Sequence, residues 1–231
     1  MTDLAPVVSD PSRASDAQLM TAFTQMVEHP DYPCLGARSV FRQENATVRV
    51  YDELATPDGT RRLGADLTDY VKRLGARAAG GPFVSFVAVF RGPGITDERA
   101  FEDLLWRQLR QLHREDDTEW STDVASDPED PHFAFSVAGT PFFIVGLHPA
   151  SSRDARRAPT PTLVFNLHEQ FVELRASGHF PRMRDAIRSR DEGLQGSLNP
   201  MVDDFGGSSE ARQYSGRHVG DDWIAPFVEE A

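Results

Sequence analysis

The chain has 231 residues, of which 39% are hydrophobic and 26% charged, and its formal net charge is -12. That length is sufficient for one domain with a substantial hydrophobic core. The acidic charge argues against general binding to nucleic acids or anionic membranes, but it is compatible with a local basic pocket. With a single cysteine, Cys34, the chain can form neither an intrachain disulfide nor a zinc site of the CxxC type.

The location and domain organisation follow from the absence of targeting patterns. No apolar run approaches the length of a membrane span, and the N-terminal residues lack the basic and apolar regions of a signal peptide. We therefore expect a cytoplasmic protein without membrane or nucleic-acid partners, and a homodimer is left open. Residues 1–15, rich in Pro, Ser and Asp, are predicted to be a flexible arm that precedes a single domain over 16–231.

Hydrophobic periodicity predicts alternating helices and strands. The predicted helices cover about 16–28, 63–79, 96–113, 169–177 and 181–189, and the predicted strands cover 47–51, 83–90, 133–137, 142–148 and 163–168. Residues 56–59 are predicted to be a turn, and the acidic stretch 114–131 a solvated loop. Because a short turn joins the strands 133–137 and 142–148, the sheet is expected to be mixed and largely antiparallel. The expected fold is α+β, a single domain with a sheet of about five strands flanked by helices.

The stretch 140–170 contains the strongest candidate site. Its two apolar runs end in His148 and His168, and a basic loop lies between them. The polar residues that accompany the histidines are Arg153, Arg156, Arg157, Asn166, Glu169 and Gln170. Apolar walls with a few convergent polar groups are typical of a small-molecule or cofactor site. Two core strands with solvated ends would give the same pattern.

Other motifs leave several chemistries open. The sequence contains no GxxxxGK[ST], GxGxxG, HExxH or GxSxG motif. His148, His168 and Glu169 have the residue types of a non-haem metal site, although their spacing matches no known ligand signature. Cys34 follows a proline and precedes a glycine and an arginine. Near a helix N-terminus and a cation its pKa would be lowered, which favours a ligand or nucleophile; the alternative is a small buried hydrophobic residue.

Several segments resemble those of the YqcI/YcgG family, also described as FPC/CPF motif-containing proteins. Tyr32-Pro33-Cys34 stands for the first motif and DWIAPF at 222–227 for the second. Between them lie GLHPASSR at 146–153, FNLHEQF at 165–171, GSLNPM at 196–201 and QYSGR at 213–217. The resemblance covers about residues 16–227. Two positions depart from the family motifs: Tyr32 replaces Phe, and Ala225 replaces Cys.

The resemblance implies haem b and a haem-dependent monooxygenase. Its reaction would be N-hydroxylation of a guanidine or amino-acid substrate such as L-arginine, with O2 and an external electron donor. His148 is the first choice for the axial ligand of the iron, because it ends a strand and Pro149 follows it; Cys34 and His168 remain alternatives. In this arrangement His168 and Glu169 would act in catalysis.

The same resemblance assigns the other polar residues. Haem propionates need cations, which Arg153, Arg156 and Arg157 would supply, with Cys34 also at the cofactor; a solvated basic loop is the alternative. A guanidinium substrate needs a carboxylate and amide acceptors, for which Glu169 is the candidate, with Asn166 and Gln170. The alternative for Glu169 is a surface carboxylate in a first helical turn.

Three further residues and three other functions stay open. Arg212, Tyr214 and Arg217 are candidates for binding a substrate carboxylate or closing the site. The first alternative function is a non-catalytic haem-binding or gas-sensing protein, which the alanine at 225 favours. The others are a non-haem metal enzyme that uses His148 and His168, and a haem-free structural or interaction protein.

Overall fold

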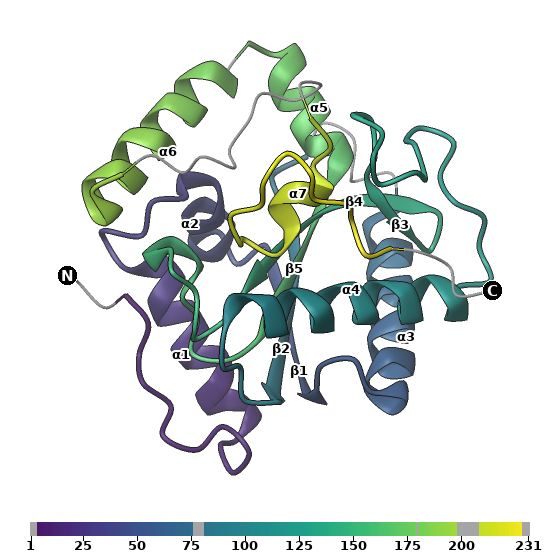
Figure 1. The fold of residues 1–231 in the computed structure, drawn as a ribbon. Coiled ribbons are helices and arrows are strands. Elements are labelled where there is room, and N and C mark those ends of the chain that lie inside the picture. Colours follow the sequence, from purple (N-terminus) through teal and green to yellow (C-terminus); the bar gives the residue numbers. More distant parts are fainter. Residues whose placement is uncertain (1–3, 76–80, 179, 198–207, 228–231) are drawn as a thin grey trace.

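A five-stranded sheet forms the centre of the computed structural model, which describes residues 4–75, 81–178, 180–197 and 208–227. The strands are β1 (Ala46–Glu53), β2 (Ser85–Gly92), β3 (Phe135–Val137), β4 (Thr140–Leu147) and β5 (Thr162–Leu167), in the order β1-β2-β5-β4-β3 (Figure 1). β1 and β2 are parallel, and every other pair is antiparallel. The predicted single-domain α+β fold with a largely antiparallel sheet is therefore confirmed.

Helices cover both faces of the sheet (Figure 1). α1 (Asp16–Glu28) and α2 (Leu35–Arg42) pack on one face, and α3 (Pro57–Leu74) and α4 (Glu98–Glu115) pack on the other. The later helices are α5 (His168–Ala176), α6 (Phe180–Gln195) and the short α7 (Ala211–Tyr214), and a 3-10 turn, η2, covers Asp154–Arg156. α7 lies against β4 on the α4 face.

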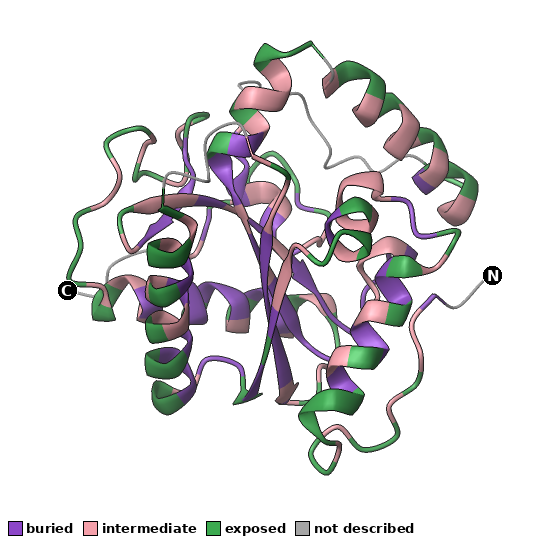
Figure 2. Cartoon of the chain, turned by 180° about the vertical axis from the view of Figure 1, so that it is seen from behind, coloured by how far each residue is buried: buried purple, intermediate pink, exposed green. Residues whose placement is uncertain are grey.

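The central strand β2 explains why the sheet is covered on both sides. Phe86, Ala88 and Phe90 point into the cluster under α3 and α4, whereas Val87 and Val89 point into the cluster under α1 and α2. Side chains alternate between faces along a strand, so a continuous apolar run requires a hydrophobic layer on each side. Figure 2 shows the result: the strands are buried, while the helices are exposed on their outer faces.

Capping residues explain where the helices begin. Ser15 and Gln18 form a capping box that begins α1, in agreement with the predicted start. Thr56 caps α3 by accepting a hydrogen bond from the Gly59 N–H, and Pro57 occupies the first helical turn. Residues 56–59, predicted as a turn, are thus the start of a helix, because Thr-Pro fits the first turn of a helix as well as it fits a turn.

Two other helices differ from the sequence-based prediction. α2 was not predicted, and α6 continues to Gln195 instead of ending near 189. α2 is only eight residues long and buries only Val40 fully, so its periodic signal in the sequence is weak. The predicted extension of the third helix over 76–79 and the motif residues 198–201 lie outside the described residues.

The N-terminal segment and the surface complete the fold. Leu4, in the segment predicted to be a flexible arm, is 4% exposed and packs into the cluster under α1.

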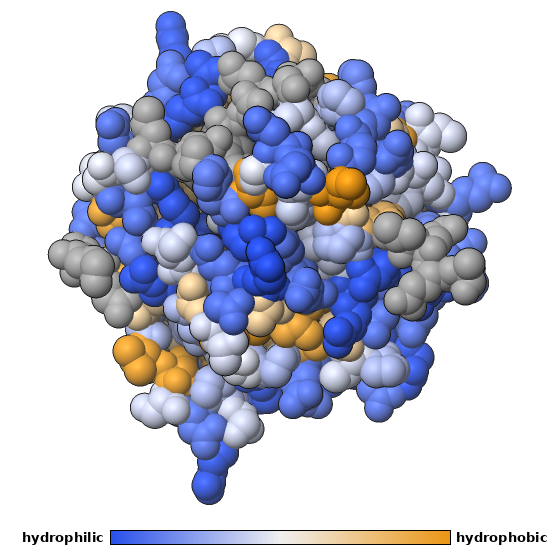
Figure 3. All heavy atoms as spheres, viewed as in Figure 1, coloured by the Kyte–Doolittle hydropathy of each residue, from blue (hydrophilic) through white to orange (hydrophobic). Residues whose placement is uncertain are grey.

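On the face in Figure 3 the hydrophobic side chains form separate small spots on a hydrophilic surface. Within the described residues, none of the helices combines the length and the apolar character needed to cross a bilayer.

Candidate functional site

The two histidines of the candidate site lie at opposite ends of the sheet. β4 and β5 pair antiparallel, from Phe142 with Leu167 to Leu147 with Thr162. His148 follows the end of β4 and His168 follows the end of β5, and the paired residues between them span about 17 Å of strand. Because a metal–nitrogen bond is about 2 Å long, one ion cannot bind both. The alternative of a joint site made of His148 and His168 is therefore wrong, and no described group of three His, Cys, Asp or Glu residues could hold a metal ion.

His148 is fixed in position by its main chain and by α4. Its N–H donates to the carbonyl of Arg156 (3.0 Å), and its own carbonyl accepts from the N–H groups of Ser151 and Ala158 (3.3 Å each). The imidazole is stacked on Phe101 of α4, with 4.3 Å between ring centroids and 25° between ring planes. The backbone of His148 is thus fixed by hydrogen bonds, and its ring is fixed by stacking on Phe101.

The imidazole of His148 is unusual because neither of its nitrogens has a hydrogen-bond partner among the described residues. The residue is 1% exposed, and both Nδ1 and Nε2 are enclosed. Burial lowers the pKa of His148 to about 4; the carboxylates of Glu98 and Asp97 oppose this shift, and Arg156 adds to it. The ring is therefore neutral at pH 7. Nearly all buried polar atoms are hydrogen-bonded, and leaving one unpaired costs about 1–3 kcal/mol. The His148 ring is therefore the candidate ligand-binding group of this end of the sheet, although protein atoms enclose both of its nitrogens.

Two arginines of the basic loop are held by carboxylates of the same chain. Arg153 is 8% exposed, forms an ion pair with Asp191 of α6, and donates to the hydroxyl (3.2 Å) and carbonyl (3.1 Å) of Ser197. Arg157 pairs with Asp154 at 2.9 Å and donates to the Ser151 carbonyl at 3.2 Å. The loop predicted to be basic is therefore folded onto α6 and onto itself, and the net charge that it offers to a ligand is reduced.

Arg156 has a different environment. β3 pairs only with Thr140–Phe142, so the remaining edge of β4 is open to other partners. Arg156 fills this edge by donating to the carbonyls of Gly146 (2.9 Å) and Gln213 (3.2 Å). Within the described part of the chain no carboxylate forms an ion pair with its guanidinium. Burial lowers the pKa of Arg156, an effect opposed by the nearby groups of Tyr32, Cys34 and Asp191.

Two glutamates of α4 hold the loops that flank His148. Glu98 accepts from the N–H (2.9 Å) and the hydroxyl (2.7 Å) of Ser152. Glu102 is 4% exposed and accepts from the Ser215 hydroxyl (3.0 Å) and from Arg217 Nε (2.9 Å) and Nη2 (2.5 Å). Arg217, a sequence candidate for closing the site, thus anchors the segment 213–217 to α4. The segments GLHPASSR and QYSGR are brought together by these bonds.

Cys34 lies on the α1/α2 face, where it caps the N-terminus of α2. Its Sγ accepts from the Ala37 N–H at 3.4 Å. Burial raises the pKa of the Cys34 thiol, and this outweighs the opposing effects of the Ala37 and Gly36 N–H groups and of Arg156. The lowered pKa considered from the sequence is not found, because the cost of burying the thiolate exceeds the gain from the helix N-terminus and the cation.

The two positions named in the family motifs are separated by the sheet. Cys34 packs against the hydrophobic cluster of the α1/α2 face, whereas Ala225 is 2% exposed in the aromatic cluster of the α3/α4 face. The Ala225 N–H donates to Glu129 at 3.0 Å. In the same motif, the ring of Trp223 lies under the guanidinium of Arg212, whose central carbon is 5.8 Å from the ring centroid. In this chain the second motif therefore contributes aromatic packing on the face opposite Cys34.

His168, at the other end of the sheet, lies in a buried acid–base cluster. Its Nδ1 is 3.9 Å from Glu210, whose other carboxylate oxygen accepts from the Tyr214 hydroxyl at 3.0 Å. The Tyr214 hydroxyl also accepts from the Phe135 N–H at 3.1 Å. Burial raises the pKa of Glu210 to about 8 and lowers that of His168 to about 4. Glu210 holds its proton at neutral pH, so the pair is a neutral acid beside a neutral imidazole.

The predicted substrate-binding trio does not converge on one point. Asn166 accepts from the Ser85 hydroxyl (2.7 Å) and donates to the Phe143 carbonyl (3.3 Å). Gln170 donates to the Pro82 carbonyl (3.0 Å) and accepts from the Val84 N–H (3.1 Å), which ties α5 to the chain before β2. Glu169, between them, is exposed. The two amides are occupied by structural bonds at the His168 end of the sheet.

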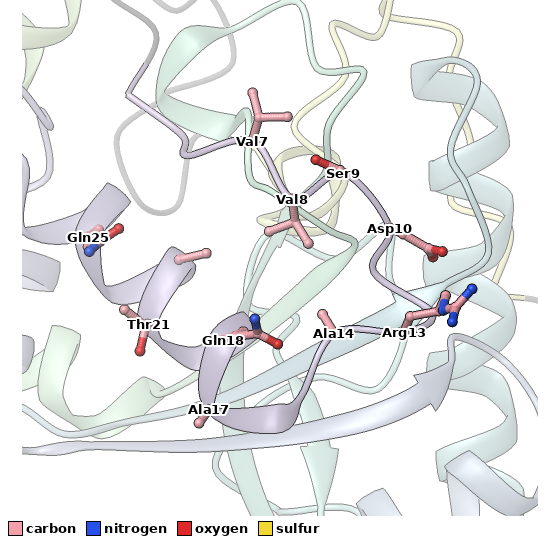
Figure 4. A pocket seen from close by; sticks show the side chains of 11 residues that line it. Val7, Val8, Ser9, Asp10, Arg13, Ala14, Ala17, Gln18, Thr21 and Gln25 are labelled. Atoms are coloured by element: carbon pink, nitrogen blue, oxygen red, sulfur yellow. The ribbon is translucent and has the colours of Figure 1, made fainter.

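A hollow of the surface lies away from all these residues. It has a volume of about 600 Å³ and lies between residues 7–14 and α1, lined by small and polar side chains (Figure 4). Val7 and Val8 project from one side, and Gln18, Thr21 and Gln25 from the other. None of the residues predicted from the sequence lines it, so it adds nothing to the chemistry of the candidate site.

Several residues of the site were missed in the sequence. Phe101 and Asp191 were not among the candidate site residues. Glu98, Glu102 and Glu210 received no role. Each is brought to the site by tertiary packing, and a single sequence has no local pattern that reports such contacts.

The fold and this arrangement define a three-layer α+β protein with a buried histidine at one end of its sheet, whose nitrogens have no hydrogen bond to the described residues. The chain belongs to the YqcI/YcgG family, whose model matches residues 23–228. It is 29% identical over 192 residues to Uncharacterized protein YcgG of Bacillus subtilis (strain 168), covering 79% of this chain and 75% of that protein. It is 27% identical over 169 residues to Uncharacterized protein YqcI of the same strain, covering 70% and 65%. No solved structure matches.

Proposed function

We propose that this chain binds haem b through His148 and acts as a monooxygenase that N-hydroxylates a guanidine such as L-arginine. The observation that carries the proposal is the pair of unpartnered, enclosed nitrogens of the neutral His148 ring. A neutral imidazole is a common axial ligand of haem iron, and coordination would satisfy one of the two nitrogens. The choice of a guanidine substrate depends on the family resemblance.

The donor set fits haem better at His148 than at the rival ligands. Cys34 is a protonated thiol that caps a helix, whereas a thiolate is the form that binds iron. His168 faces the protonated Glu210 at the other end of the sheet. Because both nitrogens of His148 are covered by protein atoms, coordination requires neighbouring side chains to move.

Arg156 is the best-placed cation for a propionate. It is adjacent to His148 through the backbone bond from His148 N–H, and its guanidinium is held only by carbonyl oxygens in the described structure. A carboxylate placed there would supply the missing opposite charge through charge-assisted hydrogen bonds. Arg153 and Arg157 support the same region but already have carboxylate partners.

The residues of the chain would orient the components and exclude water. When bound, haem supplies O2 binding and oxidation chemistry, with electrons from an external donor. Phe101 fixes the plane of the His148 ring, and Glu98 and Glu102 hold the flanking loops. Because the pKa of His148 is about 4, its ring is neutral above pH 5 and would be able to bind iron over the physiological pH range.

The direct test is the absorption spectrum of protein purified from haem-supplied cells, in the ferric, reduced and carbon-monoxide forms. A Soret band with a carbon-monoxide form near about 420 nm supports histidine ligation, whereas one near about 450 nm makes Cys34 the ligand. The absence of a Soret band would contradict the proposal and would favour the alternative of a haem-free structural or interaction protein.

A non-catalytic haem-binding or gas-sensing protein is the second candidate, and Ala225 favours it. The second family motif contributes a buried methyl group here instead of a thiol. The two functions differ in their response to substrate. L-arginine should shift the haem spectrum of an N-hydroxylase and be consumed with O2 and a reductant; a sensor would show neither effect.

A further inference from the structure

Aromatic side chains of the α3/α4 face form a row that leads from the surface to a buried tyrosine. Trp223 is half-buried, and its neighbour Ile224 is 70% exposed. The ring centroid of Trp223 is 6.1 Å from that of Trp106, and the Trp106 ring is stacked on Tyr214 at 5.7 Å and 23°. Trp106 and Tyr214 are both fully buried. Indole and phenol rings are among the side chains that lose one electron most readily, and rings this close exchange electrons by tunnelling.

The Tyr214 hydroxyl lies against a buried acid–base pair. It donates to Oε1 of Glu210 at 3.0 Å, and Oε2 of Glu210 is 3.9 Å from Nδ1 of His168. The hydroxyl oxygen also accepts from the Phe135 N–H at 3.1 Å, and the Phe142 carbonyl is a second acceptor at 3.4 Å. An oxidised phenol is a strong acid, so a tyrosine is oxidised readily only where a neighbouring group accepts its proton. The Tyr214 hydroxyl has such a neighbour.

Two other tyrosines of the same hydrophobic cluster, Tyr51 and Tyr70, lack this combination. The hydroxyl of Tyr70 has no hydrogen-bond partner among the described residues. Tyr51 donates to Asp66 at 2.7 Å, but its ring packs on Phe90, and a phenyl ring does not lose an electron under the conditions that oxidise indole. At Tyr214 an adjacent indole and a proton-accepting pair occur together.

We propose that Tyr214 is a redox-active residue that loses one electron to become a neutral tyrosyl radical. The electron leaves through Trp106 and Trp223 to a one-electron oxidant at the surface. As the O–H bond breaks, its proton passes to Oε1 of Glu210, and the proton on Oε2 passes to Nδ1 of His168. The products are the tyrosyl radical, a neutral Glu210, an imidazolium and the oxidant reduced by one electron.

The surroundings of the pair permit this transfer. Burial raises the pKa of Glu210 to about 8, so this side chain has a proton to pass on as it receives another. Burial and the charge of Arg175 lower the pKa of His168 to about 4. An imidazolium with that pKa is still a much weaker acid than an oxidised phenol, so the transfer is favourable. Glu210 and His168 have to close from 3.9 Å to a hydrogen-bond distance of about 2.7–3.2 Å.

The inference goes beyond the proposed function and does not require haem. It assigns a one-electron site to the α3/α4 face, whatever group His148 binds. Protein without haem that forms the Tyr214 radical would support this inference and contradict the proposed function, so the two can fail separately.

Flash oxidation of the purified protein tests the inference. The oxidant is photogenerated tris(bipyridine)ruthenium(III), and electron paramagnetic resonance of the frozen sample distinguishes tyrosyl from tryptophanyl radicals. Wild type should give a tyrosyl signal that Tyr214→Phe loses, whereas Tyr51→Phe and Tyr70→Phe should keep it. A tyrosyl signal that survives in Tyr214→Phe, or its absence from wild type, overturns the inference.

Variants that retain Tyr214 test the route even if Tyr214→Phe does not fold. Trp223→Phe should lose most of the tyrosyl signal, because the entry point for the oxidant is removed. Trp120→Phe is the matched control and should keep it, since this indole packs on other rings of the cluster. Glu210→Gln should convert the tyrosyl signal into a tryptophanyl one, because an amide does not accept the phenolic proton and the oxidation stops at the indoles. Wild-type tyrosyl yields in both Trp223→Phe and Glu210→Gln would overturn the proposed site.

Discussion

The two ends of the β4–β5 pair contain histidines in the same sequence pattern but in different environments. His148 and His168 each follow an apolar strand, each is buried, and burial lowers the pKa of each to about 4. His148 is stacked on an apolar ring, and neither nitrogen is hydrogen-bonded within the part of the chain that the structure describes. His168 lies beside Glu210, which Tyr214 also contacts. The difference is one of partners, so a similar pKa does not imply a similar role.

Charge distribution supports the same distinction. Arginines 153, 156 and 157 gather at the His148 end, where Arg156 has no carboxylate partner among the described groups. At the His168 end the buried acid Glu210 keeps its proton because the effect of burial on its pKa outweighs the opposing effects of the Tyr214 hydroxyl and the Arg175 charge. Under the proposed function the first end would bind the anionic, iron-containing haem, whereas the second end holds a proton on Glu210.

Removing each imidazole should give the largest contrast. His148→Ala should lose most of its haem, because the proposed iron ligand is gone, whereas His168→Ala should keep its haem and lose activity. Haem per protein chain, measured after gel filtration, gives the comparison. His132→Ala is the control, since that ring is exposed. If His148→Ala retained haem and His168→Ala lost it, His168 and not His148 would be the iron ligand.

Glu210→Gln should change how stability depends on pH. The folded pKa of about 8 lies above the ordinary value of 4.5, so between these values the unfolded chain has lost a proton that the folded chain keeps. Wild-type stability therefore falls as pH rises through this range and levels off above pH 8. Glutamine has no proton to lose. The variant should be more stable than wild type at pH 8.5, by on the order of 5 kcal/mol, and similar to it near pH 4.5.

Urea unfolding at several pH values measures this difference. Glu169→Gln is the matched control, because its carboxylate is exposed on the neighbouring helix α5. A constant difference between Glu210→Gln and wild type across the pH range would contradict the assignment of a protonated acid beside His168.

Gly146→Ala should disturb the His148 end through packing. A methyl group there would lie 2.7 Å from side-chain atoms of both Leu105 and Phe101 and 2.8 Å from the Tyr214 carbonyl. We expect a loss of about 1–3 kcal/mol in unfolding free energy and displacement of Phe101 from the His148 ring. Gly193→Ala, in α6 with no atom within 4 Å of the added methyl, should instead stabilise by about 0.5–1 kcal/mol. Equal midpoints of thermal unfolding would contradict this packing.

The smallest effect is expected at Glu169. Because its side chain is exposed, Glu169→Gln should leave stability and L-arginine affinity unchanged within about 0.5 kcal/mol. Gln170→Ala should instead cost about 1–3 kcal/mol of stability, because it leaves the Val84 N–H and the Pro82 carbonyl without partners. A tenfold loss of L-arginine binding in Glu169→Gln would restore this residue as the substrate carboxylate.

Much of the fold could be predicted because its determinants are local. The apolar run 83–90 predicted a strand and the helical spacing over 16–28 predicted α1, since periodicity acts within a few residues. The start of α3 was mistaken for a turn, because Thr56-Pro57 fits both structures. The short α2 left too few buried positions to be recognised.

The candidate site was predictable only in part. Adjacency in sequence suggested that His148 and His168 could share a site, but the antiparallel register separates them. Asp191, in contrast, is 38 residues from Arg153 and meets it through α6. Glu210 reaches His168 through the approach of α7 to β4. Such contacts depend on how distant elements pack, which residue spacing alone does not encode.

The most direct test of the central claim is chemical rescue of His148→Gly with imidazole. If His148 is the axial ligand, the variant should bind haem poorly, and added imidazole should restore the Soret band and the wild-type haem content by supplying the missing donor. Wild-type haem binding by His148→Gly without imidazole, with a spectrum that imidazole does not change, would contradict the account and place the iron ligand elsewhere.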